Sequence, residues 1–257
     1  MKKSQLLSLS VAFAMAAFAA QNANAYQVFF GEDLNNSAAV PLASTPNSSA
    51  AQASFLSHLI GVGIETFEAP DNTAGQSAPL SLNFPGAGTA TLSGGNGVIV
   101  AVTPGSTNGA GRYSIPSASS SQFWEVQAGG GGNFSVTFSS PVAAFGFNGI
   151  DIGDFGGQLS LGLSNGDTLI VNNTIGSGGS TDGSVLYYGF IAQGAGEQFS
   201  SVMFNTTTGE GDIFAFDNLT VGSLRQVTIP EPATIALLGA GLAGLGFGRR
   251  RFRPERG

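Results

Sequence analysis

Acidic residues beside apolar segments are the side chains of this sequence that are best placed to do chemistry. Asp217 follows Phe216 in an apolar run, where a carboxylate is costly unless it is hydrogen-bonded, paired or bound to a metal ion. Asp151 and Asp154 bracket a turn that contains Gly153. Calcium takes about six to eight oxygen ligands from carboxylates and from carbonyls, which glycine-rich turns expose. The pattern leaves two interpretations open, calcium sites or hydrogen-bonded turns with solvated acids.

Other kinds of catalytic site find little support in the residue types. The chain has no cysteine, and His58 is its single histidine, so neither a histidine-based triad nor a zinc site is predicted. His58 is interpreted as a structural residue. The spacing of Asp151 and Asp154 does not match an EF-hand loop, because no acid follows at the twelfth position. A glycoside hydrolase needs only two carboxylates, and it remains the less favoured alternative.

Aromatic side chains with a polar atom can stack on sugar rings. The candidate ligand-binding residues are Tyr113, Trp124 and Tyr188, with Tyr187 beside the last of these. Neighbouring residues of a strand point to opposite faces, so at most one of Tyr187 and Tyr188 is expected in the core. Trp124 follows Phe123 on a predicted strand and is equally interpretable as a core residue. A carbohydrate-binding surface and a purely structural role both stay open.

The C-terminal segment combines three features with different physical roles. The prolines of Pro230, Glu231 and Pro232 disfavour helix and sheet, so this tripeptide is predicted to be extended and accessible. Residues 233–248 are apolar and uncharged, which predicts a short transmembrane helix, although a full span takes about 20 residues. The positive-inside rule places the basic tail, residues 249–257, on the cytoplasmic side; its first residues are Arg249, Arg250 and Arg251.

This order of features resembles the PEP-CTERM sorting signal of Gram-negative bacteria over residues 229–253. The resemblance implies processing by an exosortase, a membrane transpeptidase that cuts near the motif and passes the protein outward. A simple C-terminal membrane anchor is the alternative. The N-terminus agrees with export. Lys2 and Lys3 precede an apolar stretch and the small-x-small site Ala23-Asn24-Ala25, so residues 1–25 are predicted to be a cleaved signal peptide.

The charge of the exported part differs from that of the whole chain. Seven of the nine basic residues lie in the two targeting ends, which leaves Arg112 and Arg225 against 14 of the 16 acidic residues, a formal charge of −12. Such a surface repels nucleic acid and anionic membranes, so neither is an expected partner. The absence of cysteine excludes disulfides, and calcium is the expected source of extra stability.

Short apolar runs separated by Gly, Ser, Thr and Asn predict an all-β domain. Residues 26–61 are expected to form an irregular lead-in with one short helix near 49–60, capped by Ser48 or Ser49. Residues 62–228 are expected to form a β-sandwich, by strand number a jelly roll. Its predicted strands are 63–68, 89–93, 98–102, 122–127, 133–138, 142–150, 158–163, 168–171, 185–192, 198–205 and 213–221. Residues 164–167 are predicted to be a hairpin turn.

Two of these strands resemble the first and last strands of galactose-binding-like jelly rolls and carbohydrate-binding modules. The matching segments are Ile64-Glu65-Thr66-Phe67-Glu68 and Phe216-Asp217-Asn218-Leu219-Thr220-Val221. In such domains these strands lie side by side, and an acid from each holds a structural calcium ion. The resemblance therefore implies that Glu68 and Asp217 are the side-chain ligands. The turn bracketed by Asp151 and Asp154 is a second, weaker calcium candidate that rests on the residues alone.

The sequence as a whole predicts an exported, non-enzymatic protein of the cell surface or the extracellular matrix. The resemblance implies transient anchoring in the inner membrane, then release to the cell surface, the outer membrane or a biofilm matrix rich in exopolysaccharide. A calcium-stabilised carbohydrate-binding module is the alternative function. The expected partners are an exosortase and an extracellular polysaccharide.

Overall fold

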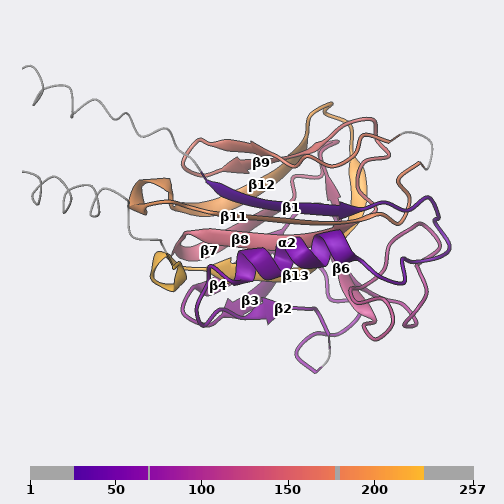
Figure 1. Ribbon diagram of the computed structural model, residues 1–257, viewed down its shortest axis with the longest axis horizontal. Helices are drawn as coiled ribbons and strands as arrows, with labels where there is room; N and C mark the ends of the chain where they lie inside the picture. The colour runs from indigo at the N-terminus through magenta and orange to yellow at the C-terminus, as the bar shows by residue number, and fades with distance from the viewer. Residues whose placement is uncertain (1–25, 69, 177–179, 229–257) are drawn as a thin grey trace, which may run out of the picture. The chain divides into compact units, whose positions relative to one another are not determined.

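Strands that alternate apolar and polar residues, and central strands buried on both faces, build two antiparallel sheets that pack on each other as a β-sandwich (Figure 1). The computed structural model describes residues 26–68, 70–176 and 180–228. The predicted signal peptide and the whole of the predicted sorting signal, residues 229–257, lie outside these residues. The described residues up to Val227 belong to one compact unit, which contains all the described core clusters and is therefore expected to fold by itself. Among the described residues, no helix is long and apolar enough to cross a membrane.

The first sheet has seven strands in the order β1-β11-β8-β13-β6-β5, with β2 paired to one end of β13. Their bounds are Gln27–Asp33 for β1, Ile64–Glu65 for β2, Val98–Ala101 for β5, Gln122–Ala128 for β6, Ala144–Ile150 for β8, Val185–Ile191 for β11 and Asp212–Gly222 for β13. All pairings are antiparallel, and β13, the last strand of the described chain, lies in the middle of the sheet.

The second sheet has six strands in the order β10-β9-β12-β7-β4-β3. Their bounds are Leu80–Phe84 for β3, Gly88–Ser93 for β4, Ser135–Val142 for β7, Leu159–Leu163 for β9, Thr168–Ile170 for β10 and Phe199–Thr206 for β12. The predicted turn at residues 164–167 joins β9 to β10 as a hairpin, and Gly166 adopts a φ of 97° there. The all-β sandwich is thus confirmed.

Phenylalanine dominates the core between the sheets. Phe147 and Phe216 stack across β8 and β13 with centroids 5.0 Å apart, and Phe134 meets Phe204 at 4.5 Å. Each ring is fully buried. Burying an aromatic side chain of this size contributes about 1.5–3 kcal/mol, so this cluster supplies much of the apolar stabilisation in a domain without disulfides.

Helix α2 (Pro46–Leu56) covers the outer face of the seven-stranded sheet (Figure 1). Its Phe55 ring packs over Gly146 and Gly189, which face each other on β8 and β11. A Cβ atom at either position would come within 2.9 Å of that ring, so these two glycines form a glycine pad that only a residue without a side chain can provide. The pad fixes where the helix docks.

The lead-in differs from the prediction in three respects. It is not irregular, because β1 pairs along its whole length with β11, so the sandwich begins near residue 27 rather than 62. The helix runs from Pro46 to Leu56 and its N-cap residue, Thr45, makes no side-chain capping bond. Asp33 caps the helix instead, accepting the N–H groups of Asn47 and Ser48 at 3.0 and 2.8 Å. Strand β3 was also not predicted.

Candidate functional site

The first predicted carboxylate pair lies where β2 meets β13. Glu65 pairs with Leu219 and Ile64 with Thr220, so two residues of the strand predicted at 63–68 lie beside the last strand, and Glu68 follows outside β2. On its β8 side, β13 shifts register between Asp217 and Thr220, and Asn218 has a φ of 50° there. This bulge lets Asp217 turn toward the segment that carries Ser114 and Ile115.

Asp217 is completely buried and accepts three hydrogen bonds. The Ser114 hydroxyl and the Ile115 N–H donate to Oδ2 at 2.9 and 2.8 Å, and the Asn218 N–H donates to Oδ1 at 2.7 Å. Burial raises the pKa of Asp217 to about 8, and the negative charge of Glu68 adds to the rise, while the three donors act against it. The carboxyl therefore changes its charge close to neutral pH.

Glu68 lies next to Asp217 and is also held by hydrogen bonds. Its Oε1 accepts the N–H groups of Ser121 and Gln122 at 2.6 and 2.8 Å, and its Oε2 accepts the Ser121 hydroxyl at 2.9 Å. The Ser114 hydroxyl lies 3.5 Å from Glu68 Oε1 and 2.9 Å from Asp217 Oδ2. One hydroxyl group thus contacts both carboxylates, and the structure brings the predicted pair together.

The residue types around this pair fit a calcium ion. Glu68 and Asp217 supply carboxylate oxygens, which are the ligands that calcium prefers. Across the described ranges, no group of three or more acidic or histidine side chains is arranged to hold a metal ion. A calcium shell here would therefore need further oxygens, such as backbone carbonyls, to complete it.

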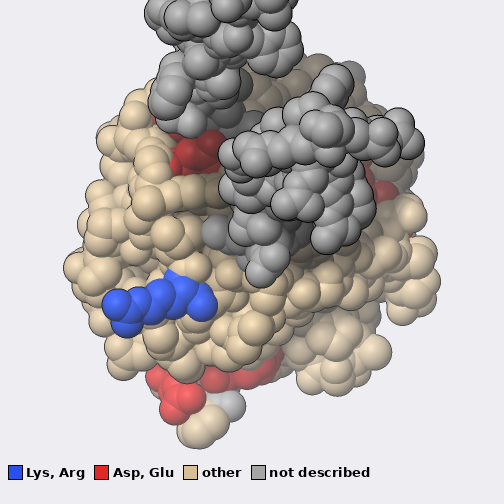
Figure 2. All heavy atoms as spheres, turned by 60° about the vertical axis from the view of Figure 1, so that its left-hand side comes forward, with Lys and Arg blue, Asp and Glu red and all other residues tan. Residues whose placement is uncertain are grey.

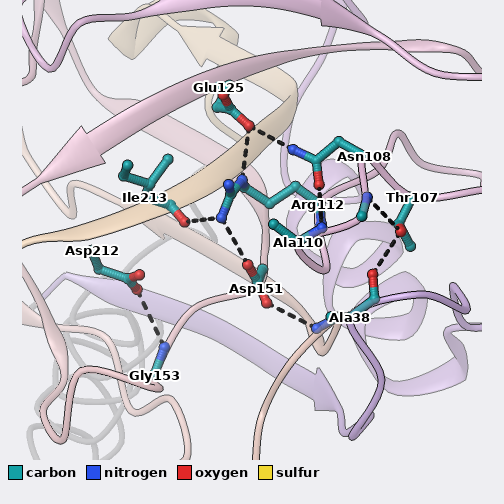
Figure 3. Close-up of polar contacts among 12 residues, drawn as sticks. Ala38, Thr107, Asn108, Ala110, Arg112, Glu125, Asp151, Gly153, Asp212 and Ile213 are labelled. Atoms are coloured by element: carbon teal, nitrogen blue, oxygen red, sulfur yellow. Dashed lines mark hydrogen bonds and ion pairs between the residues drawn. The ribbon is translucent and has the colours of Figure 1, made fainter. Parts of the chain in front are cut away.

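The second predicted pair, Asp151 and Asp154, has different surroundings from the first. Asp151 faces Arg112, whose Nη1 lies 3.1 Å from Asp151 Oδ2 and whose Nε lies 2.8 Å from Glu125 Oε2 (Figure 3). Asp151 Oδ1 accepts the Gly183 N–H at 2.9 Å. The positive charge of Arg112 lies against one oxygen of Asp151, and this disfavours a calcium ion at the same place. Asp154 is exposed. The arginine is a partner that sequence reasoning missed.

A further buried acid, Asp212, lies in the same region and was not singled out by the sequence. Its Oδ2 accepts the Gly153 N–H at 3.4 Å (Figure 3). Burial raises the pKa of Asp212 to about 8, and the charges of Asp154 and Asp151 add to the rise. Burial likewise raises the pKa of Asp151 to about 6, against the Gly183 N–H and the Arg112 charge. This end of the sandwich concentrates negative charge that one arginine offsets.

The candidate stacking aromatics are all in the core, so the prediction that one of them is exposed is wrong. Tyr113 and Trp124 are 0% exposed, and Tyr188 is 1% exposed. Tyr187, on the opposite face of β11, is also 0% exposed because Phe55 of α2 covers it, with ring centroids 5.8 Å apart. The helix removes the solvent face that simple strand alternation assigns to one of the two tyrosines.

His58 has the surroundings of a structural residue. Its Nδ1 lies 2.9 Å from the Ser54 carbonyl oxygen, its Nε2 lies 3.2 Å from Gln27 Nε2, and its ring lies 5.1 Å from that of Phe29. These contacts tie the end of the α2 segment to β1.

A cavity of about 580 Å³ opens beside β3 and β4. Its lining residues are Ser77, Ala78, Pro79, Ser93, Gly94, Asn96 and Gly97. None of these side chains is charged. The sequence offered no signal for it, because two segments that are separate in the chain form its wall. On the face that Figure 2 shows, basic side chains form one patch and acidic side chains lie in separate patches, with uncharged surface between them.

Comparison with known proteins identifies the C-terminal segment. Residues 228–251 match the model of the PEP-CTERM protein-sorting motif. No curated protein matches the chain. Among solved structures, the K2 cleaved adhesin domain of Lys-gingipain is similar over 62% of this chain and 97% of that chain, with 13% identity and a TM-score of 0.35. The chain therefore carries a PEP-CTERM sorting motif behind a β-sandwich domain, and it is an exported protein of the kind that an exosortase processes.

Proposed function

We propose that this chain is a non-enzymatic protein of the cell surface or extracellular matrix, delivered there when an exosortase removes its C-terminal segment. The sorting motif at residues 228–251 carries the proposal, because its function is to direct the domain that precedes it. Transient anchoring in the inner membrane precedes release. The acidic, cysteine-free domain then acts as a component of an exopolysaccharide-rich biofilm or floc matrix.

The features of the sandwich support a binding or structural role over catalysis. The uncharged lining of the 580 Å³ cavity holds no acid or base that could move a proton. Asp151 and Glu125 are engaged by Arg112, and Glu68 and Asp217 accept N–H groups from the backbone. The carboxylates of these acids therefore serve as hydrogen-bond and ion-pair acceptors within the fold.

We also propose that Glu68 and Asp217 bind a structural calcium ion. Two adjacent carboxylates in a buried position repel each other when both are ionised, and a divalent cation would remove that cost. The ion would tie β2 to the central strand β13, with no role in a reaction.

Sorting is tested in the native host with the full-length chain. Pro230, Glu231 and Pro232 are replaced together by alanine, and Glu210→Gln, an exposed change outside the motif, is the control. The wild type and the control are expected to be shortened and to leave the inner membrane, whereas the triple variant stays full-length in it. Equal processing and location of all three proteins would refute exosortase sorting through this motif.

A calcium-stabilised carbohydrate-binding module is the second candidate function. The uncharged cavity beside β3 and β4 is the observation that favours it, although the aromatics first considered for that role are buried.

A further inference from the structure

The two sheets differ sharply in charge. The six strands of the second sheet contain no Asp, Glu, Lys or Arg, whereas every acid that lies in a strand of the described chain belongs to the first sheet. Those acids are Glu32, Asp33, Glu65, Glu125, Asp212 and Asp217. In a domain whose formal charge is −12, the outer face of the second sheet is a broad surface without charge.

Hydroxyl groups form rows across this face. Ser81 of β3 pairs with Thr91 of β4, Thr91 with Thr137 of β7, and Thr137 with Ser201 of β12, so one row crosses four strands. Strand spacing separates such groups by about 4.8 Å. In the next row, Ser93 of β4 pairs with Ser135 of β7. The result is a two-dimensional array of groups that both donate and accept hydrogen bonds.

Contacts between strands hold part of this array in place. The Ser81 and Thr91 hydroxyls lie 3.1 Å apart, and the Thr89 hydroxyl donates to Asn83 Oδ1 at 3.2 Å. The Thr89 N–H donates to the Ser139 hydroxyl at 2.9 Å. Side chains that are already ordered lose less entropy when a ligand binds, so the face is preorganised for hydrogen bonding.

The uncharged cavity continues this face. Ser93 belongs both to the second row and to the cavity wall, and Pro79 of the wall leads directly into β3. Its volume of about 580 Å³ lies within the range of small-ligand sites. An extended ligand could therefore lie along the hydroxyl rows and place one unit in the cavity.

From this combination we propose that the outer face of the second sheet, together with the cavity, binds a neutral polysaccharide. Sugar hydroxyls match the Ser, Thr and Asn groups, and an uncharged chain avoids the repulsion that the acidic domain exerts on anionic polymers. A second copy of this chain fits less well, since protein interfaces rely on Trp, Tyr and Arg anchors and the outward positions of these strands hold none. The proposal rests on the extracellular location argued above.

The test uses native gel electrophoresis of the 26–228 domain in gels that contain hydroxyethyl cellulose, dextran or galactomannan, with alginate as the anionic comparison. We expect at least one neutral polymer to retard the domain and alginate to have no effect. Thr137→Glu and Thr91→Glu place a charge in the first row and should weaken retardation about tenfold or more, because the carboxylate loses water against the ligand. Ser54→Glu, an exposed change on α2, adds the same charge away from the face and should bind normally.

Two results would overturn the proposal. One is the absence of retardation by every neutral polymer, or a loss that Ser54→Glu shares with Thr137→Glu. The other is a concentration-dependent dimer in sedimentation velocity that Thr137→Glu disrupts, with no polysaccharide binding, which would assign the face to a second copy. Either result leaves the sorting experiment untouched, so the failure of this inference is distinguishable from the failure of the proposed function.

Discussion

Replacing Asp217 with asparagine is expected to weaken the folded domain at acidic pH and to strengthen it at alkaline pH. The substitution keeps the shape of the side chain but converts one acceptor oxygen into an NH2 donor. Ile115 donates its N–H to one oxygen of Asp217 and Asn218 donates to the other, so the new NH2 group must face one of these donors. A buried donor left unsatisfied costs about 1–3 kcal/mol.

The loss of the charge acts in the opposite direction and depends on pH. Burial raises the pKa of Asp217 from 3.8 to about 8, so the folded state holds this proton more tightly than the unfolded state does. The resulting stability is fully present below the unfolded pKa and is lost as the pH rises through the folded pKa. At about 1.4 kcal/mol per pH unit, the wild type loses roughly 4 kcal/mol between about pH 5 and about pH 8 through this carboxyl.

Combining the two effects predicts a crossover. In chelator, Asp217→Asn should be less stable than the wild type by about 1–3 kcal/mol near pH 5 and more stable by a similar amount near pH 8. Urea unfolding of the 26–228 domain at several pH values measures this directly. Glu210→Gln removes an exposed acid and serves as the control for the loss of one charge.

Calcium adds a second measurement on the same proteins. At about 100 times its Kd, a ligand that binds only the folded state stabilises it by about 2.7 kcal/mol. Protons compete with calcium for Asp217, so this gain should be larger near pH 8 than near pH 5 and absent in Asp217→Asn. Identical pH profiles for Asp217→Asn and Glu210→Gln would refute the reasoning about burial, and a calcium gain retained in Asp217→Asn would refute the site.

Three further predictions concern the fold around the sites. Phe55→Ala removes the ring over the glycine pad and should cost about 3–5 kcal/mol in urea unfolding; a loss below about 1 kcal/mol would mean that the helix does not depend on the pad. Arg112→Gln strips Glu125 and Asp151 of their cation and should cost up to about 3 kcal/mol near pH 8. The loss should shrink near pH 5, where Asp151, with a pKa of about 6, is protonated, and an equal loss at both pH values would contradict this. Asp33→Ala removes the cap of α2 and should cost about 1–2 kcal/mol, with faster amide exchange in the first turn of the helix; unchanged exchange would show that the cap is dispensable.

The alternation of apolar and polar residues predicted several strands correctly. It did not predict elements whose structure depends on contacts with distant parts of the chain. Leu159, Leu161 and Leu163 all point into the core of the sandwich, as their spacing indicates. Strand β3 was not predicted because Pro79 and Pro85 flank it, and prolines are typical of loops. Since β3 is an edge strand, the proline at its start removes no hydrogen bond that the sheet needs.

The candidate sites show the same division. The resemblance to known first and last strands correctly predicted that Glu68 lies near Asp217. The pairing of β2 with β13 brings the segment that carries Glu68 close to Asp217. The ion pair between Arg112 and Asp151 joins residues 39 positions apart in the sequence, both of them outside the strands, and no periodicity relates them. The burial of Tyr187 depends on α2, which alternation along one strand cannot reveal.

The central position of β13 constrains the order of events during export. Until Asp212–Gly222 emerges, β8 and β6 each have an unpaired edge and Glu68 has no neighbouring Asp217. A chain that crosses a membrane from its N-terminus therefore cannot close its first sheet before nearly all of the domain has passed. The sorting motif begins at residue 228, soon after Gly222, the last residue of that strand. In a chain exported from its N-terminus, the first sheet would therefore be completed at about the time the sorting motif reaches the membrane.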